Sequence, residues 1–227
     1  MWDALEKVKK WWQNIPLPRR MFWIMLVFYV ATRLIGLTQF PIYFFGDEAA
    51  QANRAIDLVR DKGVGYDGVF LPTFFPNNGS YIHSVSVYVQ LAAYLLFGRS
   101  VWAVRFLPVV LSVLPAIWVS LTLRNVYEVK HWWAGGFLLS VVPVWFLHSR
   151  TAFMTSLLVV FYAGFLYHYL MYRKGHPHHL LWSLFWGSVA FYSYSAGQVI
   201  VVVSGVLFFL FDFKYHWKNR KWWPWAD

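Results

Sequence analysis

The chain is divided into long apolar runs by short polar connections, and this pattern constrains its fold more than any other feature. A helix needs about 20 mostly apolar residues to cross the roughly 30 Å hydrocarbon core of a bilayer. Helices satisfy all their backbone hydrogen bonds internally, as lipid requires. We therefore expect an all-α fold, a polytopic bundle of transmembrane helices. The apolar runs are 21–37, 83–97, 102–123, 132–147, 152–172 and 180–213.

The last run, 180–213, is too long for one crossing and short for two. As a single helix of about 34 residues it would extend about 51 Å, whereas two spans would have about 17 residues each. Lys and Arg gather on the cytoplasmic side of membrane proteins, and their distribution mildly favours one bent pass and six spans in total. Length favours a break within residues 192–197 and seven spans. Both arrangements remain open, with seven as the working choice.

Composition agrees with a membrane protein. Hydrophobic residues make up 59% of the chain and charged residues only 13%, whereas about a quarter of an ordinary soluble domain is charged. The net charge of +10 comes from Lys and Arg that flank the apolar runs, where they anchor helix ends at lipid headgroups. This placement argues against nucleic-acid binding. The absence of Cys excludes disulfides, thiolate metal sites and a Cys nucleophile.

Three segments are expected along the chain. Residues 1–20 predict an amphipathic segment on the cytoplasmic membrane surface, with no signal-peptide cleavage site after it. Residues 21–213 form the transmembrane module, and residues 214–227 form a basic, aromatic tail. Within the module, residues 38–82 form the only long polar stretch, which we place outside as the first external loop. Apolar residues at three- and four-residue steps predict a short surface helix in this loop: Ala49, Ala52, Ile56 and Val59.

Asp47 and Glu48 begin that surface helix, and they are the leading candidates for chemistry. Two carboxylates at a membrane surface can accept a proton, orient a hydroxyl group or bind a divalent cation. A simpler interpretation is helix capping, because an acidic residue at the start of a helix binds its free amides and complements its dipole. Composition alone favours the capping role.

Basic and imidazole side chains near the apolar runs form a second set of candidates. Arg33, Arg105 and Arg150 are costly in lipid unless they reach the interface or pair with an anion. The guanidinium fork suits phosphate oxygens, although each arginine taken singly is more often a topology anchor. His83 stands where the acidic loop returns to the membrane, which makes it a weaker candidate.

Several short motifs follow one another in a recognisable order. Together they resemble the N-terminal half of the GT-C superfamily of membrane glycosyltransferases, in the branch of the dolichyl-phosphate-mannose protein mannosyltransferases and lipid A aminoarabinose transferases. No single motif is specific, but their order over nearly the whole chain is. The motifs are ATRL (31–34), GDEA (46–49), LPTFF (71–75), HSVSVY (83–88), FGRSVWAVRFLP (97–108), SRTA (149–152) and YSYSAG (192–197).

The resemblance implies transfer of a sugar from a polyprenyl-phosphate donor to an acceptor on the external face. Asp47 would act as the base or acceptor-orienting carboxylate, with Glu48 supporting it or a divalent cation, the one cofactor that the resemblance suggests. Lipid or donor-phosphate binding is assigned to Arg105, Arg150, His83 and Arg54. Alternation of the expected spans, however, places Arg105 and Arg150 near the cytoplasmic side, far from Asp47.

The family's enzymes are usually much longer than this chain, which corresponds to about the first half of their membrane domain. We therefore expect either part of an enzyme or a shortened relative that works with partner membrane subunits. The leading function is a polyprenyl-phosphate-dependent glycosyltransferase that contacts membrane lipids. The alternative is a non-catalytic membrane subunit that uses the same module as a lipid-binding scaffold. The expected location is a bacterial inner membrane, with the N-terminus cytoplasmic.

Overall fold

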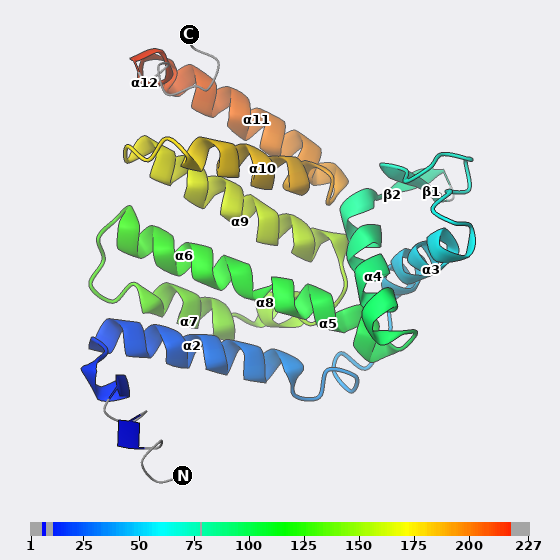
Figure 1. Ribbon diagram of the computed structural model, residues 1–227, viewed down its shortest axis with the longest axis horizontal. Helices are drawn as coiled ribbons and strands as arrows, with labels where there is room; N and C mark the ends of the chain where they lie inside the picture. Colours follow the sequence, from blue (N-terminus) through cyan, green and yellow to red (C-terminus); the bar gives the residue numbers. More distant parts are fainter. Residues whose placement is uncertain (1–5, 8–10, 78, 219–227) are drawn as a thin grey trace.

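The computed structural model describes residues 6–7, 11–77 and 79–218, and it is mostly helical. Long helices lie side by side in a bundle, while a group of shorter elements covers one end of it (Figure 1). We call this the loop end, and the opposite end, where α12 lies, the tail end. The helices are α2 (Leu17–Leu34), α3 (Gly46–Arg60), α4 (Ser84–Phe97), α5 (Val101–Leu111), α6 (Val113–Asn125), α7 (Trp133–Val141), α8 (Pro143–His148), α9 (Met154–Arg173), α10 (His179–Phe191), α11 (Ser195–Phe211) and α12 (Phe213–Lys218).

The predicted surface helix of the first loop is present as α3, but its packing differs from the prediction. The buried residues of α3 are Glu48, Gln51, Ala55 and Leu58, rather than the apolar stripe that begins with Ala49. Helix α3 packs chiefly against α4. Of the apolar stripe, Ala49, Ala52 and Ile56 are half-buried and Val59 is exposed.

Helix α4 corrects the predicted topology. Its sequence was expected to form the second span, yet α4 lies across the loop end, roughly perpendicular to the long helices (Figure 1). The next helix segment, α5 with α6, starts at the loop end and runs back through the bundle (Figure 1). Apolar composition could not distinguish these orientations, because a helix under a covering layer is as apolar as a short span.

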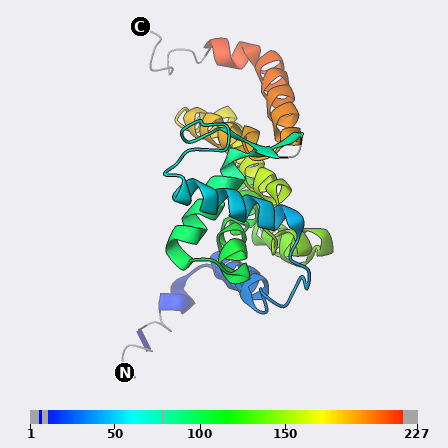
Figure 2. The same ribbon diagram turned by 90° about the vertical axis from the view of Figure 1, so that its right-hand side faces the viewer.

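The loop end also contains a small hairpin that the sequence did not predict. Strand β1 (Phe74–Asn77) pairs antiparallel with β2 (Ser80–His83), with Phe74 opposite His83. Gly and Pro are frequent in residues 63–79 and favour turns over strands. Pro76 is tolerated because the hairpin has only two strands, which leaves each strand with an unpaired edge. Figure 2 views the loop end directly, with α3 in front and the hairpin above it.

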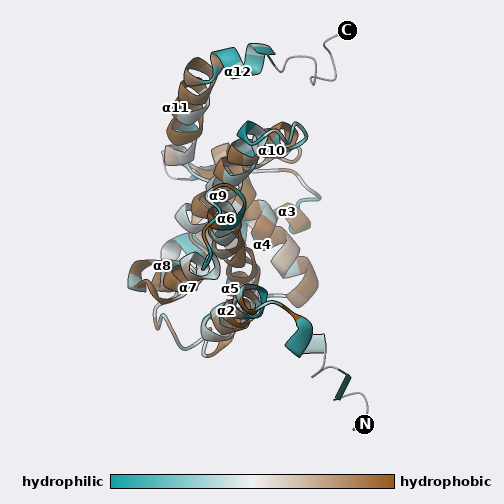
Figure 3. Cartoon of the chain, turned by 90° about the vertical axis from the view of Figure 1, so that its left-hand side faces the viewer, coloured by the Kyte–Doolittle hydropathy of each residue, from teal (hydrophilic) through white to brown (hydrophobic). Residues whose placement is uncertain are grey.

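The last apolar run is divided, as its length predicted. Helix α10 ends at Phe191 and α11 begins at Ser195, so the break lies within residues 192–197. At the start of α11, a Cβ on Gly197 would lie 2.6 Å from the carbonyl oxygen of Ala190, so only glycine permits this close approach of the two helices. Figure 3 shows that α11 consists mainly of hydrophobic residues and that α12, which follows it, is more polar.

Two helix segments in the described part of the chain are long and apolar enough to cross a membrane by themselves, Val101–Asn125 and Met154–Arg173. Shorter apolar helices accompany them: Ser84–Phe97, His179–Phe191 and Ser195–Phe211. The main core lies between the long helices and contains Tyr29, Trp145 and Phe161. Of the predicted surface segment 1–20, residues 1–5 and 8–10 lie outside the described residues, as do residues 219–227 of the tail.

Candidate functional site

The two carboxylates at the start of α3 have different environments. Glu48 is completely buried. Its Oε1 accepts hydrogen bonds from Arg105 Nε and the Ala152 amide, both at 3.0 Å. Its Oε2 accepts from Arg105 Nη2 at 3.0 Å and from the Phe45 amide at 3.1 Å. Glu48 therefore caps its own helix and ties it to α5 and to the segment before α9.

Asp47 is exposed. Within the described part of the chain it forms no hydrogen bond or ion pair. The amides of the first helical turn have no intrahelical acceptor, and their dipole complements a carboxylate at this position. Asp47 is thus held at a fixed point of the loop end by a rigid neighbour, with both of its oxygens available.

Arg105 is the buried partner of Glu48, with 1% of its side chain exposed. Its remaining N–H groups donate to the carbonyl oxygens of Leu37, Pro41 and Tyr43 at 2.8–3.1 Å. Arg105 was expected to lie far from Asp47, but it contacts Glu48, the neighbouring residue. Because α4 does not cross the bundle, α5 starts at the loop end rather than at the opposite end.

Arg150 lies at the same end, so its expected separation from the start of α3 is wrong for the same reason. Its five N–H groups donate to carbonyl oxygens at the C-terminus of α2 and in the following turn, at 2.6–3.1 Å. Helix C-termini leave such carbonyls without partners and attract cations. Arg105 and Arg150 both have all their N–H groups occupied by protein acceptors, which leaves none for a phosphate.

Arg33 belongs to the same group of buried arginines. Its Nη1 donates to the Ser140 carbonyl at 2.7 Å, and its Nη2 donates to the Leu139 carbonyl at 3.3 Å. These carbonyls are free because Pro143, which lacks an N–H group, interrupts the helix between α7 and α8. Arg33 therefore donates hydrogen bonds to the carbonyls at the break between α7 and α8, instead of reaching the lipid interface.

His83 lines a cavity of about 600 Å³ between the hairpin and the starts of α9 and α11. Its ring is 5% exposed, and its Nδ1 has no hydrogen-bond partner. Burial lowers the pKa of His83 below its usual value of 6.5, so the ring is neutral at neutral pH. We call this space the hairpin cavity; its other lining residues are Phe74, Ser80, Tyr81, Met154, Tyr194, Ser195 and Gln198.

The start of α3 is connected to the hairpin cavity by packing. The Phe45 and Phe153 rings lie 5.0 Å apart, and Phe153 directly precedes Met154 in the cavity wall. Ala50, one helical turn beyond Asp47, packs against the same apolar cluster as Met154. Asp47 is thus on the flank of α3 that leads to the hairpin cavity.

Arg54 holds α3 against the hairpin strand. Its Nη2 donates to the Pro76 carbonyl at 2.9 Å, and its guanidinium lies 4.2 Å from the centre of the Tyr66 ring. In the described residues, no three His, Asp or Glu side chains come together as a metal site would require. Both carboxylate oxygens of Glu48 already accept hydrogen bonds from the protein. Glu48 therefore has no free oxygen with which to bind the divalent cation that the resemblance suggested.

Sequence reasoning identified Asp47, Glu48 and His83 but missed Met154 and Gln198 of the cavity wall. The YSYSAG motif was the available signal for the start of α11, which borders the cavity, but nothing in the sequence connected it to the hairpin.

The chain matches a sequence model of the dolichyl-phosphate-mannose-protein mannosyltransferases over residues 84–226. The match covers more than half of the chain and starts at α4, so it does not include Asp47 or Glu48. No curated protein and no solved structure matches the chain. The resemblance noted from the motifs is thereby confirmed at the level of the family.

Proposed function

Because the chain belongs to the dolichyl-phosphate-mannose-protein mannosyltransferase family, we propose that it transfers a sugar from a polyprenyl-phosphate donor to an acceptor hydroxyl at the loop end. The observation that carries the proposal is the different environment of two adjacent carboxylates. Glu48 is buried with four hydrogen bonds, while Asp47 is exposed beside it. The arrangement holds one free carboxylate rigidly at the membrane surface.

In the proposed reaction, the acceptor oxygen attacks the anomeric carbon of the donor. The bond from that carbon to the phosphate oxygen breaks, and the polyprenyl phosphate leaves with the electron pair. The hydroxyl proton passes to Asp47, which acts as general base. A carboxylate in this role must lie within about 3 Å of the hydroxyl, and the open flank of Asp47 permits that approach.

The hairpin cavity is the proposed place for the donor's sugar phosphate. Helices α9 and α11 both start at its wall, with Met154 and Ser195 as their first residues. Helix N-termini bind phosphate through free amides and the helix dipole. Arg105 and Arg150 do not bind the phosphate in this proposal, since all their N–H groups are engaged; they shape the first loop.

We further propose that the chain crosses the membrane six times, with the loop end external. The crossings are α2, α5 with α6, α7 with α8, α9, α10 and α11. In the described residues, nine Lys and Arg belong to segments at the tail end and seven to segments at the loop end. Three of those seven are the buried Arg33, Arg105 and Arg150. This distribution supports a cytoplasmic tail end.

The proposal is tested by label transfer from a radiolabelled polyprenyl-phosphate sugar in membranes that contain the chain. The Asp47→Asn variant should lose at least a hundredfold in rate, the scale of a general base. The matched control is Asp67→Asn, which neutralises another exposed carboxylate of the same loop and should retain full transfer. A folded wild-type chain that transfers no sugar from any donor tried would contradict the proposal and favour the scaffold alternative.

A further inference from the structure

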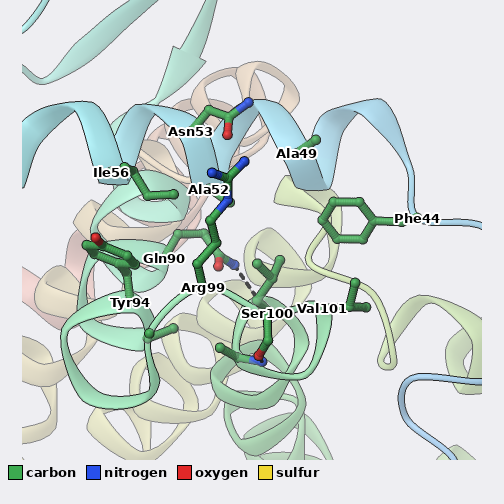
Figure 4. A pocket seen from close by; sticks show the side chains of 14 residues that line it. Phe44, Ala49, Ala52, Asn53, Ile56, Gln90, Tyr94, Arg99, Ser100 and Val101 are labelled. Carbon is green, nitrogen blue, oxygen red and sulfur yellow. Dashed lines mark hydrogen bonds between the residues drawn. The ribbon is translucent and has the colours of Figure 1, made fainter.

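A second cavity, of about 390 Å³, lies between α3 and the turn from α4 to α5 (Figure 4). We call it the turn cavity. Ala49, Ala52 and Ile56 of α3 line it. At about 100° per residue around a helix, Asp47 lies nearly opposite the middle of this stripe. The turn cavity and the proposed active site are therefore on different flanks of α3.

The α3 wall of the turn cavity contains three of the four residues of the apolar stripe that the sequence singled out, all but Val59. These side chains form no part of the two buried cores, and they face a hollow rather than a protein partner (Figure 4). Opposite them stand Ala93 of α4 and Val104 of α5. Apolar surface on two sides of an open cavity suits a ligand with a hydrocarbon part.

Gln90 provides a buried, unsatisfied acceptor in this cavity. Its side chain is 3% exposed. Its Nε2 donates to the Val104 carbonyl at 2.9 Å, but its Oε1 has no hydrogen-bond partner. A buried acceptor without a partner is unfavourable, so the site favours a ligand that brings a hydrogen-bond donor.

Arg99 provides a free cation at the same cavity. Its side chain extends from the turn towards Ala52 and Asn53 of α3 (Figure 4). Unlike Arg33, Arg105 and Arg150, it forms no ion pair or hydrogen bond with any described residue.

The start of α5 adds a second anion-binding element. The Ser100 hydroxyl accepts a hydrogen bond from the Ala103 amide at 3.0 Å and caps the helix. The amides of Val101 and Trp102 precede the first intrahelical bonds and remain available. Gly98 has a φ of +71°, which favours glycine, and it turns the chain so that Arg99 and the start of α5 adjoin one cavity.

Exposed apolar side chains surround this turn. Leu95 and Leu96 are 65% and 68% exposed at the end of α4. The Trp102 ring stacks on Phe106 at 4.5 Å, and the Phe97 ring meets the edge of both. Exposed Leu side chains and a Trp such as Trp102 are typical of the headgroup level of a membrane, which favours a lipid as the ligand of this cavity.

We propose that the turn cavity binds the headgroup of a membrane phospholipid that carries a hydroxyl or ammonium donor beside its phosphate. Arg99 and the first amides of α5 bind the phosphate oxygens. The headgroup donor bonds Gln90 Oε1, and the lipid's hydrocarbon part contacts the apolar stripe of α3. The site is independent of glycosyl transfer, because its ligand lies across α3 from Asp47.

The test is native mass spectrometry of the purified full chain in detergent, titrated with phosphatidylglycerol. Arg99→Gln should weaken phosphatidylglycerol binding about tenfold, the scale of one charge-assisted hydrogen bond. Ala52→Phe, which fills the cavity without changing charge, should weaken it similarly. The matched control is Lys62→Gln, which removes another exposed cation of the loop end and should change the affinity less than twofold.

Competition distinguishes the possible sources of the phosphate. Inorganic phosphate at a concentration equal to that of the lipid should leave phosphatidylglycerol bound, because it cannot use the apolar walls. Displacement by inorganic phosphate would overturn the lipid assignment. Preferential displacement by polyprenyl phosphate would make the cavity part of the donor site and overturn its independence. Equal binding by Arg99→Gln and wild type, or an equal loss in Lys62→Gln, would overturn the site itself.

Discussion

At the residue scale, Asp47 and Glu48 differ by one position in the chain and by almost everything in their surroundings. One helical residue turns a side chain by about 100°, which is enough to bury Glu48 against Arg105 and leave Asp47 in the open. From the sequence alone, the two carboxylates could serve either as a helix cap or as chemical groups. The structure gives the capping role to Glu48 through the Phe45 amide, which leaves the chemical role to Asp47 in the proposal.

The Glu48 and Arg105 pair should be essential for stability. Glu48→Gln leaves a buried guanidinium without its counter-charge, and breaking a buried ion pair in this way costs about 3–5 kcal/mol. We expect thermal unfolding of the purified variant to show a loss of that size. Asp47→Asn should change stability by less than about 0.5 kcal/mol, as exposed substitutions usually do. Equal stability of wild type and Glu48→Gln would contradict the stabilising role of the Glu48–Arg105 pair.

His83 should make stability depend on pH. Its folded-state pKa is lowered by burial, so the folded state binds fewer protons than the unfolded state below the usual pKa of 6.5. Stability is therefore fully present above pH 6.5 and falls as the pH drops below it. His83→Phe, which keeps a ring against Phe74 and Tyr194, should reduce this decline. Unfolding midpoints of wild type and His83→Phe, measured from pH 7.5 to 5, check this prediction. Identical pH dependence of the two midpoints would refute the role of His83.

At the scale of elements, the orientation of α4 decides which residues meet. A crossing α4 would put the start of α5, and with it Arg105, at the opposite end of the bundle from α3. With α4 lying across the loop end, Arg105 reaches Glu48 and Arg150 reaches the C-terminus of α2. Arg150 and Arg33 then bind carbonyls that a helix end and Pro143 leave free, while Arg105 binds Glu48 and carbonyls of the loop between α2 and α3.

The orientation of α4 is testable because the chain contains no Cys. Single Cys substitutions of Asp67, Arg99 and Lys130 can be labelled with a membrane-impermeant maleimide in intact cells. We expect labelling at positions 67 and 99 from outside, and at position 130 only after the membrane is opened. Protection of position 99 in intact cells, with position 67 labelled, would show that α4 crosses the membrane.

At the scale of the whole molecule, the sequence predicted a helical chain, the position of α3 and the break between α10 and α11. Those features depend on local periodicity, on length and on turn-forming residues, which sequence displays directly. It did not predict the hairpin or the direction of α4, because both depend on which surfaces are covered by other elements. The sequence therefore placed Arg105 and Arg150 at the end opposite Asp47, whereas both lie at the loop end. The hairpin cavity could not be predicted either, because its wall combines residues from three distant parts of the chain, within 74–83, at 154 and within 194–198.

In the proposed function the two carboxylates have separate roles. Glu48 holds the start of α3 in place, and Asp47 accepts the proton of the acceptor hydroxyl. The most direct measurement compares sugar transfer and thermal unfolding for wild type, Asp47→Asn and Glu48→Gln in the same preparation. We expect Asp47→Asn to lose transfer by at least a hundredfold while its unfolding midpoint stays at the wild-type value. We expect Glu48→Gln to lose both transfer and stability. Retained transfer in a stably folded Asp47→Asn variant would contradict the account.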